Sequence, residues 1–185
     1  MLQSSKIKTL GYDKIATIGL LGAMSVVLGV MENFIPLPVP GVRLGLANLP
    51  VMVMLYTGGA VPAMLVMILK ISLVPVLSGN LIFRLSLSLP AGTMAFLGML
   101  ICVLFLKRYS SAITTGTVGA TLHMITQIWV IDHLYIKGIF SASIAGWFII
   151  AALCTGILTG ITATVLINRI VPVLPGLRTQ LIKDK

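Results

Sequence analysis

Lys70 stands in the middle of an otherwise apolar run of the chain, VPAMLVMILKISLVPVLS at 61–78. Several other apolar runs of similar length precede and follow this one. A helix needs about 20 apolar residues to cross the hydrocarbon core of a bilayer, and a charge at that depth costs roughly 2.5–3.5 kcal/mol or more. Such a chain is expected to fold as helices inside a membrane, with Lys70 facing a cavity, a partner or a substrate.

The composition of the chain supports a membrane location. Hydrophobic residues make up 58% of the chain and charged residues only 9%, whereas a soluble domain carries about 25% charged residues. The net charge is +9, but the basic residues lie mostly at the ends of apolar runs and are not interleaved with aromatic residues. This distribution is typical of membrane topology and argues against nucleic-acid binding. Cys102 and Cys154 lie inside apolar runs without a metal-ligand spacing, so we interpret them as small buried side chains.

The apolar runs predict an all-α integral membrane protein, a single domain built as a bundle of six transmembrane helices. The predicted spans are 15–33, 44–57, 61–78, 85–106, 112–131 and 143–167, followed by a cytoplasmic tail at 168–185. The second span is short for a bilayer crossing, so we expect it to be tilted, to be re-entrant or to begin within the proline-rich loop before it. Residues 1–33 also resemble a signal peptide, but the long apolar stretch without a small-residue cleavage site indicates a first membrane helix.

The distribution of basic residues predicts the orientation of the bundle. Of the 13 lysine and arginine residues, only Arg43, Lys70, Arg84 and Lys137 lie within the spans or on the side away from the termini. The other basic residues lie on the side that holds both ends of the chain. Because cytoplasmic loops carry the excess of lysine and arginine, we expect a multi-pass protein of a prokaryotic cell membrane with both termini in the cytoplasm.

Most of the remaining polar residues fall in the outer half of the predicted bundle. There we expect them to line a cavity that carries more positive than negative charge. Arginine offers bidentate contacts to an acidic group and lysine a point charge, which favours an anionic or phosphate-bearing ligand. His123 and Gln127 are four residues apart and share one helix face. The predicted substrate-binding residues are Arg43, Asn48, Lys70, Asn80, Arg84, His123 and Gln127, and the candidates for an ion pair or gate are Glu32, Asp132 and His133.

Simpler interpretations of these residues remain open. Arg84 and Lys70 can extend their charged ends to the lipid headgroups, and Lys70 can instead form a structural ion pair with Glu32. The polar pair of the fifth span can hydrogen-bond between helices. Asp132 and His133 can form an ordinary cap at the membrane interface.

Small residues at helical spacing occur in the first span, including Gly19 and Ala23. Such a pair lets another helix approach closely, either within the bundle or from a partner subunit. The sequence contains no phosphate-binding P-loop, no DDxxD motif, no serine nucleophile elbow and no metal-ligand cluster. We therefore expect no enzyme activity from this chain alone and no bound cofactor or metal.

Two segments carry a resemblance to a known family. The segments PGVRLGLANLP at 40–50 and SGNL at 78–81 resemble the Gx transporter family, whose members are often labelled heptaprenyl diphosphate synthase component I. The number of spans, the small residues of the first helix and the outward polar pocket are also similar to the substrate-binding S component of an energy-coupling factor (ECF) transporter.

The resemblance implies a membrane-embedded subunit that binds a small, anionic, vitamin-like or isoprenoid-related ligand from the outer side. Such a subunit depends on a membrane coupling protein and cytosolic ATPases, and it docks through an AxxxA-like motif for which Gly19 and Ala23 are the nearest match. The family label implies an alternative, a non-catalytic membrane component of a heptaprenyl (polyprenyl) diphosphate synthase. An independent channel or secondary carrier is a third interpretation.

Overall fold

The structure is a computed structural model that describes residues 2–37, 39, 41–105, 111–138 and 142–169. Its helices are α1 (Leu2–Met31), α2 (Leu49–Thr57), α3 (Ala60–Leu77), α4 (Leu81–Phe105), α5 (Ala112–Leu134) and α6 (Ala142–Arg169), with short 3-10 helices η1 (Glu32–Phe34) and η2 (Leu46–Asn48). No strand occurs in the described residues, so the prediction of an all-α fold is confirmed. Each predicted span corresponds to one α-helix, and the predicted tail from residue 170 on lies outside the described residues.

Within the residues that the structure describes, four helical segments are long and apolar enough to cross a membrane, which makes the chain a membrane protein. These segments are Lys14–Phe34, Ala60–Leu77, Leu81–Phe105 and Gly146–Arg169. Helix α5 has a comparable length of 23 residues, but its many threonines and glycines make it less apolar. Helix α2 has 9 residues, which at about 1.5 Å per residue is far shorter than a bilayer core of about 30 Å.

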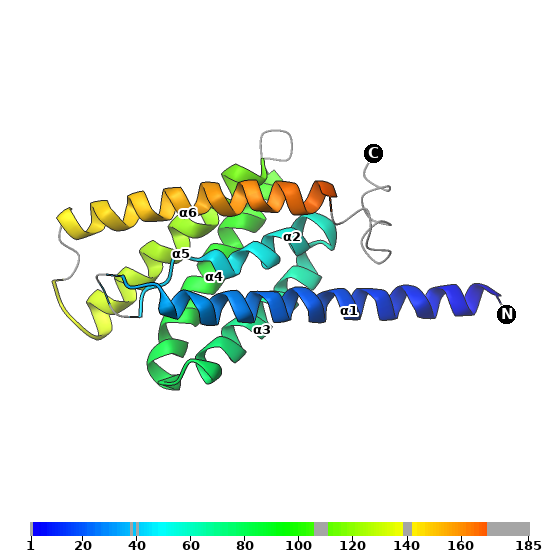
Figure 1. The fold of residues 1–185 in the computed structure, drawn as a ribbon, viewed down its shortest axis with the longest axis horizontal. Helices are drawn as coiled ribbons and strands as arrows, with labels where there is room; N and C mark the ends of the chain where they lie inside the picture. Colours follow the sequence, from blue (N-terminus) through cyan, green and yellow to red (C-terminus); the bar gives the residue numbers. More distant parts are fainter. Residues whose placement is uncertain (1, 38, 40, 106–110, 139–141, 170–185) are drawn as a thin grey trace.

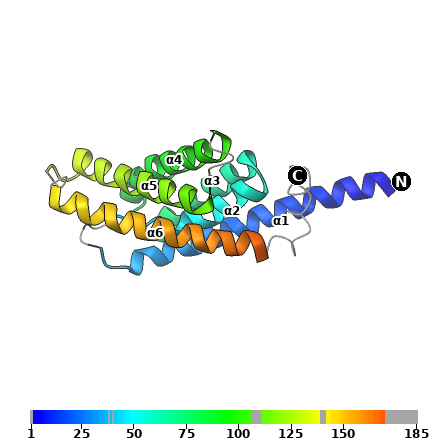
Figure 2. The same cartoon turned by 90° about the horizontal axis from the view of Figure 1, so that it is seen from above.

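Helices α1 and α6 lie roughly along the long axis of the molecule, α3 and α4 cross it obliquely, and α2 lies among the longer helices (Figures 1 and 2). Helix α1 begins and α6 ends at the same end of the bundle. At the opposite end lie the loop at 35–45, the end of α5 and the start of α6, and we call this the loop end. The turn between α3 and α4 also belongs there, because the Nδ2 of Asn33 donates to the Oγ of Ser78 at 2.7 Å.

Helix α2 is buried over almost its whole surface, including the residues from Pro50 to Leu55. Its sequence is apolar all round, which is typical of a helix with no solvent-facing side. It packs against α1, α3 and α6. The short second span is therefore an interior element of the bundle and carries η2 on its N-terminal end.

Helices α5 and α6 approach each other at their backbones. A Cβ atom added to Gly156 of α6 would lie 2.5 Å from the Cα of Thr117 in α5, and one added to Gly116 would lie 2.7 Å from the carbonyl oxygen of Gly156. Glycine at these positions permits the close approach that membrane helices use in place of a hydrophobic driving force. This contact positions the polar face of α5 inside the bundle.

The described residues of the loop at 35–45 fold back onto the bundle. Val39 and Val42 are buried in an apolar cluster with Leu87 of α4 and with Met124 and Ile128 of α5. Burial of such side chains is worth about 1.5–3 kcal/mol each. Leu44 packs against the same cluster, so the loop is anchored on both sides of Arg43, and this arginine is held in the interior.

Candidate functional site

A set of polar side chains lies inside the apolar bundle near the loop end. Each is at most 6% exposed, and they come from η1, the 35–45 loop, η2, α3, α4 and α5. We call them the polar cluster: Glu32, Arg43, Asn48, Lys70, Ser88, His123 and Gln127. Charged side chains at membrane depth are costly, and they usually mark a ligand or ion site with a named partner.

Glu32 and Lys70 both bind η2. The Oε1 of Glu32 accepts a hydrogen bond from the backbone N–H of Ala47 at 3.1 Å, and the Nζ of Lys70 donates to the Oδ1 of Asn48. Gly45 precedes η2 with a φ of 89°, a conformation that glycine adopts without strain. The N-terminus of a helix favours a negative charge, so Glu32 sits where the η2–α2 segment is most positive. Lys70 also attracts the Glu32 carboxylate.

Arg43 links the loop to α4 and α5. Its backbone N–H donates to the Oε1 of Gln127 at 2.8 Å, and its Nη2 donates to the Oγ of Ser88 at 2.7 Å. The Nε2 of Gln127 lies 3.2 Å from the Nε2 of His123. Because Gln127 uses its oxygen as the acceptor for Arg43, its nitrogen is the donor, and His123 accepts at Nε2. We therefore assign the histidine proton to Nδ1.

Some buried polar atoms of the cluster lack a protein partner. They include the Nε of Arg43 and the Nδ2 of Asn48, whereas the ring N–H of His123 has the backbone of Ala91 as its partner. A buried donor without a partner costs about 1–3 kcal/mol, and natural proteins leave few such groups unexplained. A polar ligand or ordered water would satisfy these donors, so the cluster has binding capacity that the protein itself does not use.

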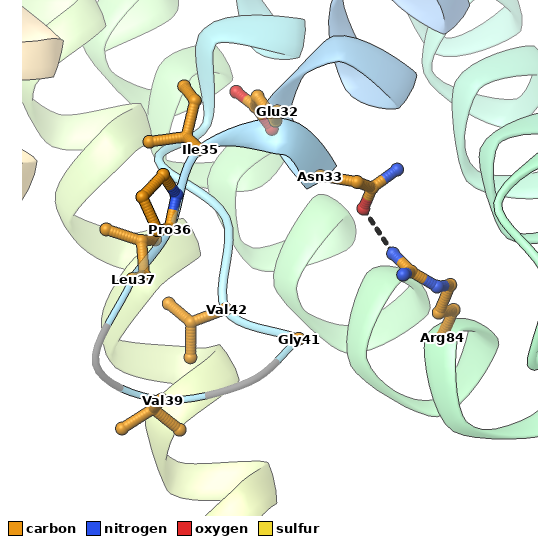
Figure 3. A pocket seen from close by; sticks show the side chains of 9 residues that line it. All are labelled: Glu32, Asn33, Ile35, Pro36, Leu37, Val39, Gly41, Val42 and Arg84. Atoms are coloured by element: carbon orange, nitrogen blue, oxygen red, sulfur yellow. Dashed lines mark hydrogen bonds between the residues drawn. The ribbon is translucent and has the colours of Figure 1, made fainter.

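A cavity of about 310 Å³ adjoins the polar cluster at the loop end (Figure 3). Its lining residues are Glu32, Asn33, Ile35, Pro36, Leu37, Val39, Gly41, Val42 and Arg84. Arg84 of α4 donates to the Oδ1 of Asn33, and these two side chains with Glu32 form a polar side of the lining. The loop supplies apolar side chains across from them. Glu32 belongs to both the cavity and the cluster and therefore joins the two.

Positive charge exceeds negative charge when the polar cluster and the adjoining cavity are taken together, although Arg84 and Glu32 are the two charged residues in the cavity lining itself. Arg43 and Lys70 are buried and Arg84 is half-buried, whereas Glu32 is the acidic residue among them. Arg84 and Arg43 repel each other, as do Arg43 and Lys70. Burial lowers the pKa of the Arg43 guanidinium, and the Glu32 charge opposes this effect. Arginine remains charged in proteins, so the site favours an anion.

The structure brings together most of the predicted binding residues, and it gives the others different surroundings. Asn80 is exposed in the α3–α4 turn with a φ of 55°. Asp132 is half-buried and its Oδ1 accepts from the backbone N–H of Gly138 at 2.9 Å. His133 is exposed, with its ring stacked at 4.5 Å on that of Trp129. A binding or gating role for these three predicted residues stays a prediction.

Gly19 and Ala23 face away from the bundle. Both are exposed, and a Cβ atom added to Gly19 would meet nothing within 4 Å. On the other side of α1, a Cβ added to Gly22 would lie 2.8 Å from the Cδ1 of Leu69. Packing within the bundle is therefore the role of Gly22, and the Gly19–Ala23 pair remains open to lipid or to another helix.

Sequence reasoning missed Ser88 and the bonding role of Asn33. Ser88 lies four residues after Arg84 and so shares its helix face, a signal that was available in the sequence. Asn33 follows Glu32 directly, but its contact with Arg84 spans 51 residues. That contact depends on how α1 and α4 are placed, so no local pattern indicates it.

The comparisons with known proteins gave one match. A protein-family model described as heptaprenyl diphosphate synthase component I matches residues 21–166. The searches of curated proteins and of solved structures gave no match. The matched range begins in α1, ends in α6 and contains the whole polar cluster together with the residues that line the cavity.

Proposed function

We propose that this chain, which belongs to the heptaprenyl diphosphate synthase component I family, is a membrane-embedded subunit that binds a small amphipathic anion at the loop end. The observation that carries the proposal is the buried excess of positive charge beside a cavity. Arg43, Lys70 and Arg84 oppose Glu32 there, and buried donors of the cluster lack partners. An anionic head group would supply both the missing charge and the missing acceptors.

The shape and lining of the cavity support an amphipathic ligand. Its 310 Å³ is at the lower end of the range of about 300–1,000 Å³ for small-molecule sites. An acidic group would approach Arg84 and, beyond Glu32, reach toward Arg43 and Lys70. An apolar body would lie against Ile35, Leu37, Val39 and other side chains of the loop.

The biological role that we propose is the capture of this ligand for uptake by an energy-coupled transporter of the ECF type. The chain would act as the substrate-binding component, with the loop end outside the cell and both termini in the cytoplasm. The exposed Gly19–Ala23 pair would dock a membrane coupling protein that cytosolic ATPases drive. In support, the pair is not used within the bundle, and the sequence lacks a phosphate-binding loop of its own.

Ligand retention by purified variants tests the binding site. The protein is extracted in mild detergent, and mass spectrometry identifies and quantifies the small molecule that remains bound. We expect Lys70→Met and Arg84→Gln to lose most of it. Lys137→Gln serves as the control, because Lys137 is an exposed cation at the same end. Equal retention by all four proteins would remove the proposed site.

A second candidate function follows from the description of the family. The chain would be the non-catalytic membrane component of a polyprenyl diphosphate synthase, holding a soluble catalytic chain where a long apolar product belongs. Affinity purification from cells at native expression separates the two candidates. Recovery of a prenyl synthase supports the second, whereas recovery of ATPases and a membrane coupling protein supports the first. Uptake by the chain alone in liposomes would contradict both and indicate an independent carrier.

A further inference from the structure

We propose that Glu32 is a built-in counter-anion of the site and that the ligand carries a doubly negative head group of the phosphate-ester type. This inference rests on the proposed binding function and specifies the chemistry of its ligand. Glu32 would not hold the ligand but would compete with it for the surrounding cations. It would thereby set the net charge that the site accepts.

The charged side chains around Glu32 are more positive than negative in total. Lys70 attracts its carboxylate most strongly and Arg43 does so less, while Arg84 lines the same cavity as Glu32. The buried cations Arg43 and Lys70 and the half-buried Arg84, set against one acid, leave two positive charges without a counter-charge. Uncompensated charges in a buried site are strongly destabilising. A bound dianion would neutralise this site, whereas a bound monoanion would leave one positive charge uncompensated.

Glu32 is fixed in its position by a backbone hydrogen bond and by burial. Its Oε1 accepts from the backbone N–H of Ala47, and the side chain is only 3% exposed. Protein groups therefore hold the carboxylate in place at the cavity wall (Figure 3). An anion that enters the cavity meets a fixed negative charge. Neutralising Glu32 should thus strengthen anion binding, the opposite of what loss of a ligand-binding contact would do.

The experiment measures calorimetric affinity for three probes that share a branched apolar body: isoamyl alcohol, 4-methylpentanoate and isoamyl phosphate. The proteins are the unchanged full chain, Glu32→Gln and the control Lys137→Gln. Glutamine keeps an oxygen acceptor for the Ala47 N–H. The control also removes one charge near the loop end, from an exposed residue outside the polar cluster.

We expect the unchanged chain to bind the phosphate at least ten times more tightly than the carboxylate, and the alcohol least tightly. Glu32→Gln should tighten binding of both anions at least tenfold, because one unit charge within about 12 Å contributes at least that much at an effective dielectric constant of about 20. It should leave the alcohol unchanged. Lys137→Gln should change none of the three affinities.

Several results would overturn the inference. Binding of the phosphate that Glu32→Gln leaves unchanged or weakens would show that Glu32 does not compete with anions. Equal tightening of the alcohol would indicate a change of shape rather than of charge. If Glu32→Gln does not fold, the unchanged chain still decides the charge of the head group, because similar affinities for carboxylate and phosphate contradict a dianion site. A chain that binds none of the probes but retains a molecule from the cell contradicts this inference alone, and a chain that retains nothing contradicts the proposed function itself.

Discussion

The side-chain oxygen of Gln127 accepts a hydrogen bond from the backbone N–H of Arg43, a residue 84 positions earlier in the sequence, with an N···O distance of 2.8 Å. This bond joins the 35–45 loop to the middle of α5. It also fixes the orientation of the Gln127 amide, whose nitrogen then faces His123 at 3.2 Å. The position of the Arg43 backbone therefore depends on a residue of helix α5.

Replacement of Gln127 by leucine tests this dependence. Gln127→Leu would leave the buried N–H of Arg43 without an acceptor, which costs about 1–3 kcal/mol. We expect a loss of that size in the free energy of unfolding, measured by denaturant titration in detergent. Thr126→Val is the control, because the Thr126 hydroxyl bonds only the Leu122 carbonyl of its own helix. Similar stabilities for the two variants would contradict the proposed role.

A double-mutant cycle tests the coupling between Lys70 and Glu32. Lys70→Met alone leaves the Glu32 carboxylate buried with less compensation, and breaking a buried charge pair costs about 3–5 kcal/mol. Glu32→Gln in the same chain should recover a large part of this loss. The free energies of unfolding of the four proteins give the interaction energy, which we expect at about 0.5–3 kcal/mol. Strictly additive losses would show that the two charges do not stabilise each other.

Alanine substitutions in α6 test the backbone contact with α5. Gly156→Ala places a Cβ atom 2.5 Å from the Cα of Thr117, and overpacking of this kind costs about 1–3 kcal/mol. We expect a lower thermal unfolding midpoint in detergent. Gly146→Ala lies in the same helix, but its Cβ would meet nothing within 4 Å. Higher helix propensity should leave that variant unchanged or slightly more stable, so equal losses would argue against the close contact.

Cysteine labelling in intact cells tests the orientation. Both natural cysteines, Cys102 and Cys154, are first replaced by alanine. In this background Lys137→Cys lies near the loop end and Asn168→Cys at the end of α6, and both positions are exposed. We expect a membrane-impermeant maleimide to label only the first, because the excess of basic residues predicts cytoplasmic termini. Labelling of only the second would reverse the orientation and place the cavity on the cytoplasmic side.

The sequence was sufficient to predict the helices. The length and hydropathy of each apolar run indicate a buried helix of that length. Helix α3 (Ala60–Leu77), for example, matches the predicted span 61–78 to within one residue at either end. The 9 residues of α2 follow from the shortness of the run before Gly58. Helix formation and membrane insertion depend on local composition, which a single sequence contains in full.

The tertiary structure alone decided which polar residues share a site. Asn48 and Asn80 look equally suitable in the sequence, yet one is buried against Lys70 and the other is exposed in a turn. The contacts of Arg43 with Ser88 and Gln127 span 45 and 84 residues. They depend on how the helices pack and on how the loop folds back, and both result from side chains distributed over the whole chain. Hydropathy determines that a charge must face the interior, but only the packing of the helices determines which other charges it meets there.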